Sequence, residues 1–92
     1  MELAELLENE YKVYVDVFIK HHSDGRIIPF AFTWEDGTSY KINKVIEMLP
    51  AASLKAGGTG MRYTVKVGTK LTNIWLEEDN EVQRWFMEKK EL

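Results

Sequence analysis

The chain contains no cysteine, only two prolines and no long apolar run. Without cysteine, disulfides and thiolate metal sites are excluded. No stretch approaches the roughly 20 apolar residues that a membrane-spanning helix needs, so no membrane association is expected. The first residues are acidic and lack the basic region and apolar run of a signal peptide. These features predict a cytoplasmic protein.

The residues that are present suit one domain spanning 1–92 with a single core. Hydrophobic residues make up 45% of the 92 residues, including 3 Trp, 4 Tyr and 4 Phe. The net charge of −3 hides a division, because residues 12–70 carry more bases than acids while both ends are acidic. A mildly basic body between acidic ends could attract a polyanion.

Strict alternation of apolar residues is the main structural signal. Val13, Val15, Val17 and Ile19 fall on one face of residues 11–21, which predicts a half-buried strand with an aliphatic inner face. Similar patterns predict five further strands at about 27–34, 39–48, 61–67, 70–78 and 82–89.

The stretch from Ile27 to Ile46 predicts an antiparallel hairpin around an Asp-Gly turn at residues 36–37. Phe30, Phe32 and Trp34 are expected on one face of its first strand. Val45 breaks the alternation of its second strand, which predicts a bulge near residues 43–44.

Six short strands with almost no helix predict an all-β fold, a small, strongly bent antiparallel sheet or SH3-like barrel of five to six strands. An OB-like barrel is the second expectation. Such a barrel usually has a helix between its third and fourth strands, and the glycine-rich residues 50–60 would make a poor helix. Leu3, Leu6 and Leu7 predict either a short helix over residues 2–9 or a flexible leader over 1–10.

Strand faces outside the aliphatic core combine aromatic and basic residues. Such a surface is typical of single-stranded nucleic-acid binding, where bases stack on rings and phosphates meet Lys or Arg. The same side chains could instead form a second layer of core. The candidate surface consists of Tyr14, Phe18, Lys20, Arg62, Lys66 and Trp75, with either Trp85 or Phe86 and with Lys12 and Arg84 nearby.

Two further motifs could bind an ion: a glycine-rich run and a pair of histidines. A glycine-rich run could cradle an anion, although it lacks the Lys-Ser/Thr end of a P-loop and precedes a strand. This candidate anion loop consists of Lys55, Gly57, Gly58 and Gly60. Adjacent residues in a strand point to opposite faces, so His21 and His22 could share one metal ion only if they lay in the turn, with Asp24 completing the site. No metal site is predicted.

No residue pattern supports catalysis. Ser23 lies beside the histidines without any sign of an oxyanion site, and the paired acids fall in apparent turns. No cofactor is expected.

One pattern in the hairpin is carried by Pro29, Phe32, Trp34, Gly37, Tyr40, Ile42, Val45, Ile46 and Glu47. These residues resemble the Pro-x-x-Phe-x-Trp…Gly…Tyr-x-Val…Val-Leu-Asp pattern of small uncharacterised bacterial domains found near translesion-type DNA polymerases. The likeness covers only residues 29–47, and one extra residue separates Trp34 from Tyr40. The remainder, including residues 52–55, looks like a small uncharacterised family of Gram-positive bacteria. The likeness of the hairpin implies an accessory role in DNA repair. Neither likeness offers catalytic residues.

Together these observations predict a binding or accessory module without catalytic activity. A protein partner held in an aromatic groove or at a strand edge is the first expectation. A nucleic-acid-binding accessory domain is the second, and an anion- or ligand-binding domain built on the glycine loop is the third.

Overall fold

A computed structural model describes residues 12–50, 59–79 and 81–89, which form one antiparallel sheet of seven strands in the order β3-β2-β1-β7-β6-β5-β4. The predicted all-β, strongly bent sheet is confirmed. The predicted N-terminal helix or leader lies outside the described residues, and within them no helix is long and apolar enough to cross a membrane. The strands are β1 (Lys12–His21), β2 (Ile27–Thr33), β3 (Ser39–Lys41), β4 (Lys44–Pro50), β5 (Thr59–Val67), β6 (Lys70–Asp79) and β7 (Val82–Glu88).

Two Asp-Gly turns connect the first three strands. Gly25 and Gly37 have φ angles of 95° and 86°, which lie in the left-handed region that glycine adopts without steric cost. In each turn the preceding aspartate accepts a backbone hydrogen bond, from Arg26 N to Asp24 Oδ1 and from Thr38 N to Asp36 Oδ1. The predicted Asp-Gly turn at residues 36–37 is confirmed, and Asp24-Gly25 forms a second turn of the same kind.

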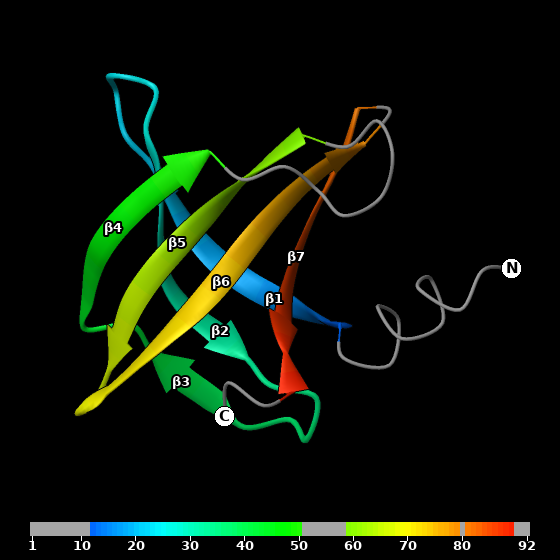
Figure 1. Ribbon diagram of the computed structural model, residues 1–92. Helices are drawn as coiled ribbons and strands as arrows, with labels where there is room; N and C mark the ends of the chain where they lie inside the picture. Colours follow the sequence, from blue (N-terminus) through cyan, green and yellow to red (C-terminus); the bar gives the residue numbers. More distant parts are fainter. Residues whose placement is uncertain (1–11, 51–58, 80, 90–92) are drawn as a thin grey trace, which may run out of the picture.

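The sheet curls because β1 changes partner halfway along its length. Residues 12–15 pair with β7, whereas residues 16–21 pair with β2. Figure 1 shows the result, with β4, β5 and β6 side by side on one side of the molecule and β1 and β2 crossing behind them at a steep angle. The space between these two layers holds the core.

A corner between β3 and β4 links the two ends of the sheet. The N–H of Ile42 donates to the carbonyl oxygen of Phe30 on β2, and the N–H of Asn43 donates to that of Lys66 on β5. The single strand predicted over residues 39–48 is thus broken where the sequence indicates a bulge, which gives seven strands instead of five to six. A second irregularity in pairing follows between Val45 and Glu47.

The core lies on the concave face of the sheet and draws on most of its strands. Its buried residues are Phe32, Ile42, Tyr63, Val65, Ile74, Leu76 and Met87. Val13 is buried and Val15 and Val17 pack against the core, as the alternation predicts.

Two side chains lie elsewhere than predicted. Ile19 is 40% exposed, and Phe30 is 51% exposed although Phe32 is fully buried. The cause is a register shift in the β1–β2 pair, where Phe18 lies opposite Ala31 but Ile19 lies opposite Pro29. Phe30 is the extra residue, so a bulge turns its ring to solvent and buries Pro29 instead.

Candidate functional site

Three aromatic rings form a row across the convex face of the sheet. The backbone register places Tyr14 of β1 opposite Phe86 of β7, and Phe86 opposite Trp75 of β6. The rings of Trp75 and Phe86 are stacked, with centroids 5.4 Å apart and an interplanar angle of 4°, and Tyr14 meets Phe86 edge-on at 6.1 Å. Phe86, and not Trp85, therefore belongs to this face.

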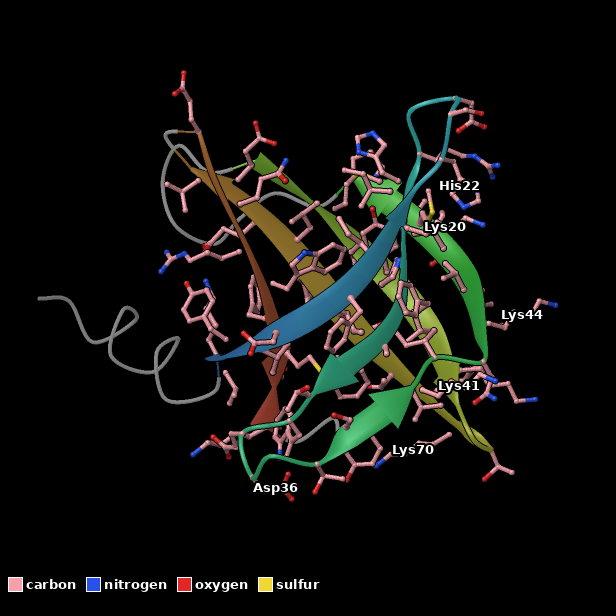
Figure 2. All side chains as sticks on the ribbon, turned by 180° about the vertical axis from the view of Figure 1, so that it is seen from behind. Lys20, His22, Asp36, Lys41, Lys44 and Lys70 are labelled. Carbon is pink, nitrogen blue, oxygen red and sulfur yellow. The ribbon has the colours of Figure 1, made fainter. Side chains whose placement is uncertain are left out.

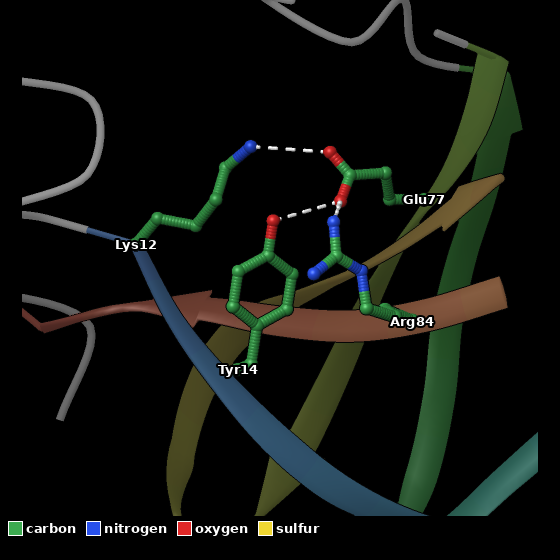
Figure 3. A network of polar contacts seen from close by, with 4 residues as sticks. All are labelled: Lys12, Tyr14, Glu77 and Arg84. Carbon is green, nitrogen blue, oxygen red and sulfur yellow. Dashed lines mark hydrogen bonds and ion pairs between the residues drawn. The ribbon is translucent and has the colours of Figure 1, made fainter. Parts of the chain in front are cut away.

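Glu77 of β6 lies beside this aromatic row and is only 4% exposed. Its Oε2 accepts a hydrogen bond of 2.9 Å from the Tyr14 hydroxyl, and its Oε1 lies 3.3 Å from Lys12 Nζ. The Arg84 guanidinium approaches Oε2 at 3.5 Å. Figure 3 shows these three side chains converging on the carboxylate from β1 and β7.

The surroundings of Glu77 decide its charge. Burial by itself raises the pKa of a carboxyl group, but the Tyr14 hydroxyl, the Lys12 ammonium and the Arg84 guanidinium together hold the pKa of Glu77 below its ordinary value. Burial, and then the hydrogen bond to Glu77, raise the pKa of the Tyr14 hydroxyl. At neutral pH the Glu77 carboxylate is therefore ionised and accepts a hydrogen bond from the neutral Tyr14 hydroxyl.

Both cations of this cluster also contact aromatic rings. Lys12 Nζ lies 4.3 Å from the centroid of Phe86, and the guanidinium carbon of Arg84 lies 4.3 Å from that of Tyr14. Each ring attracts the cation above it through its quadrupole. One carboxylate and two rings thus hold both cations, and the cluster ties β1, β6 and β7 together.

Next to this cluster, β1 and β7 separate. Their pairing ends with Val15 opposite Trp85. Continuing that register would place Asp16 opposite Arg84, yet from residue 16 onward β1 pairs with β2, and residues 82–84 pair with β6. The two strands diverge because β1 bends toward β2 while β7 stays with β6.

A groove of about 400 Å³ opens where these strands part. The apolar part of the groove consists of Val15, Val17 and Trp85, which also pack against the core. The ring centroids of Trp85 and Tyr63 lie 5.2 Å apart. Charged and polar side chains flank this part. The full lining is Tyr14, Val15, Asp16, Val17, Gln83, Arg84 and Trp85.

The structure brings together only part of the surface that the sequence suggests. Arg62 is the Cα partner of Trp75, so it adjoins the aromatic row, and its guanidinium forms an ion pair of 3.0 Å with Glu47. Phe18 is half exposed and lies in the part of β1 that pairs with β2. Its ring centroid is 6.3 Å from that of Phe30.

The two lysines of that predicted surface lie away from the aromatic row. Lys20 lies opposite Ile28 on β2. Lys66 lies four residues along β5 from Arg62, which is about 13 Å in an extended strand. One continuous surface through all six predicted residues is therefore absent from the described part of the chain.

The other predicted motifs lie partly outside the described residues. Gly60 belongs to β5, where it is the Cα partner of the buried Glu77, while Lys55, Gly57 and Gly58 fall in the segment that is not described. Over the described ranges, no group of His, Cys, Asp or Glu side chains could hold a metal ion.

Sequence reasoning missed Val15, Asp16, Val17 and Gln83 as members of a site. Their position depends on where β1 changes partner, and strand alternation does not reveal pairing partners. The sequence did indicate that Tyr14 and Arg84 lie on the same kind of surface, since both were expected outside the core. Comparisons of this chain with protein-family models, with curated proteins and with solved structures find no match.

Proposed function

We propose that this protein is a non-catalytic protein-interaction module that binds an extended peptide segment in the groove between β1 and β7. The observation that carries the proposal is the end of β1–β7 pairing at Val15 and Trp85, with a groove of about 400 Å³ beyond it.

The backbone on both sides of the groove suits an added strand. In an antiparallel sheet, alternate residues direct their N–H and C=O groups to opposite sides. Beyond residue 15, β1 pairs only with β2 among the described strands, so half of these groups face the groove. Residues 82–84 of β7 likewise pair only with β6. Such edges are what a peptide uses when it binds by strand addition.

The groove also has the volume and side chains of a binding site. Its volume lies at the lower end of the range of about 300–1,000 Å³ typical of ligand pockets. Trp85 and the two valines offer an apolar floor, while Asp16 and Arg84 place opposite charges on opposite walls. A peptide with an apolar residue facing inward and charged neighbours facing outward matches this arrangement.

Nucleic-acid binding on the aromatic row has less support. Lys12 and Arg84 share the carboxylate of Glu77, and Arg62 is paired with Glu47. A phosphate would have to compete with these carboxylates for the cations. The SH3-like barrel type, the cytoplasmic location and the accessory role in DNA repair stay predictions from the sequence.

Selection from a library of random linear peptides displayed on phage tests the proposal. The enriched peptide is synthesised and titrated calorimetrically into the wild-type protein and into Asp16→Lys. Reversing the charge of one groove wall is expected to weaken binding at least about tenfold, or 1.4 kcal/mol.

Glu35→Lys is the matched control, because it makes the same charge change on an exposed residue of the β2–β3 turn. It is expected to bind the peptide as the wild type does. Failure to enrich any peptide, or equal affinity of Asp16→Lys and the wild type, would overturn the proposal.

A further inference from the structure

A second charged surface lies at the corner where β3 and β4 link the ends of the sheet. Residues 37–46 and 60–76 contain five Lys or Arg residues and no Asp or Glu. The fold brings these two acid-free segments together, because the N–H of Asn43 donates to Lys66 O and its side chain accepts from Gly68 N at 2.7 Å.

Four exposed lysines lie at or beside this corner. Lys44 of β4 lies directly opposite Lys66 of β5, so the two ammonium groups project from the same face of the sheet. Lys41 is the last residue of β3, three residues before Lys44. Lys70 follows the β5–β6 turn, and Figure 2 shows Lys41, Lys44 and Lys70 along the same margin of the molecule.

The direct Lys44–Lys66 pair is unfavourable for folding. Like charges opposite each other in a sheet repel, whereas opposite-charge pairs at such positions typically contribute about 0.2–1 kcal/mol. Neither lysine has an ion-pair partner among the residues that the structure describes. An anion that binds between them would relieve this repulsion.

We propose that the lysine corner, defined by Lys41, Lys44 and Lys66, binds the phosphate backbone of single-stranded nucleic acid. Lysine ammonium groups on flexible stems recognise charge without a fixed geometry, so they suit a repeating phosphate chain of any sequence. The lysines lie on three strands around a bend, which a flexible polyanion can follow. A flat anionic bilayer fits this curved surface poorly, because it cannot follow the bend as a flexible strand does.

Exposed aliphatic side chains complete the surface. Leu71, the Cα partner of Lys66, is 57% exposed, and Ile46 is 49% exposed two residues beyond Lys44. They can pack against sugars and bases once the phosphates are held. In contrast to the aromatic row, no carboxylate competes for Lys44 or Lys66 within the described ranges. This surface is separate from the β1–β7 groove and does not depend on peptide binding there.

Fluorescence anisotropy with a labelled oligothymidylate of about 16 nucleotides tests the proposal. The oligonucleotide is titrated with wild-type protein, with Lys44→Gln/Lys66→Gln and with the control Lys20→Gln/Lys89→Gln. Both variants lose two positive charges, so they change the overall charge equally. The salt concentration is varied from about 50 to 200 mM.

The wild type is expected to bind at low salt and to weaken as salt rises. Lys44→Gln/Lys66→Gln should bind at least about tenfold more weakly, and the slope of log affinity against log salt should fall by about 1.4, since two phosphate contacts are lost. The control should keep the wild-type slope. Equal losses in both variants, or no binding by the wild type, would overturn the proposal.

Two further measurements keep this result interpretable. Urea unfolding should show that Lys44→Gln/Lys66→Gln is at least as stable as the wild type, because it removes a repulsive pair. Sedimentation with phosphatidylserine vesicles should show no binding that Lys44 and Lys66 control. Loss of vesicle binding in the double variant, with oligonucleotide binding unchanged, would contradict the assignment to nucleic acid.

Discussion

At the scale of single residues, Glu77 is the most informative side chain. It is a buried acid on the convex face of a sheet, and three donors from β1 and β7 converge on it. Buried charges persist only when they are paired and hydrogen-bonded. Glu77 therefore fixes the orientation of Tyr14 and Arg84, two of the residues that line the groove.

Removing the Tyr14 hydroxyl tests this role. Tyr14→Phe deletes the donor at 2.9 Å from Glu77 and should lower the free energy of unfolding by about 1–3 kcal/mol at pH 7, because a bond to a charged group is lost. Urea unfolding measures this loss of stability. Tyr40→Phe is the control, since no hydrogen bond of that hydroxyl is seen in the described part of the chain, and it should change stability little.

The effect of Tyr14→Phe should depend on pH in a defined direction. The pKa of Glu77 is lowered in the folded protein, so its contribution to stability is present above its ordinary value of 4.5 and is lost as the pH falls through the folded pKa. The difference in stability between wild type and Tyr14→Phe should shrink over that range. A constant difference down to about pH 3 would contradict the role of the ionised carboxylate.

The composition of this cluster could be predicted in part from the sequence. Tyr14 and Trp75 alternate away from the aliphatic residues of their strands, so their place on the convex face follows from the period of two. The central place of Glu77 could not be predicted, because it depends on the register of three strands. In the sequence, Glu77 is simply the first acid of a polar run.

At the scale of elements, two bends shape the molecule. One is the point at which β1 leaves β7 for β2, and the other is the corner at Ile42 and Asn43. The first produces the proposed peptide groove, and the second gathers the proposed phosphate-binding lysines. Both proposed surfaces therefore arise where regular strand pairing changes.

Asn43→Ala tests the corner. The substitution removes the side-chain oxygen that accepts from Gly68 N at 2.7 Å, while the backbone bond from Asn43 N to Lys66 O is retained. We expect a loss of about 0.5–1.5 kcal/mol in stability and faster hydrogen exchange at the Gly68 amide. Exchange at Gly68 that stays as slow as in the wild type would show that the side chain does not fix the turn against the corner.

The strands and turns were the most predictable elements. Alternating apolar residues located β1, β2, β6 and β7 to within one residue at each end, and the Asp-Gly turn at residues 36–37 forms where expected. The break in alternation at Val45 indicated the corner. Pro29 is typical of a strand start, an edge strand or a bulge, and the structure has a bulge beside it. The exposure of Phe30 was not predicted, because Phe30 and Phe32 follow an apparently regular alternation in the sequence.

At the scale of the whole molecule, one curled sheet provides both the core and the two proposed binding surfaces. The concave face holds the apolar cluster around Val65 and Ile74, both fully buried. The convex face carries the aromatic row, and the groove and lysine corner lie at its two bends. A sequence pattern shows which residues face inward, but strand order and partner changes depend on contacts between distant segments.

Core truncation should confirm which face is internal. Ile74→Ala removes a fully buried side chain and should cost about 2–5 kcal/mol, a large part of the stability of a small domain. Leu71→Ala, in the same strand but 57% exposed, should change stability by less than about 0.5 kcal/mol. Thermal unfolding measures both, and similar losses for the two variants would contradict the assigned faces.

Amide hydrogen exchange with and without the selected peptide tests the central claim most directly. In the free protein, the groove-facing amides of residues 16–18 and 82–84 are expected to exchange quickly, because β1 and β7 no longer pair there. Saturating peptide should slow these amides at least about tenfold as an added strand accepts their hydrogen bonds. Amides that are already as slow as those at the centre of β5, or that the peptide leaves unchanged, would contradict a peptide-binding groove between β1 and β7.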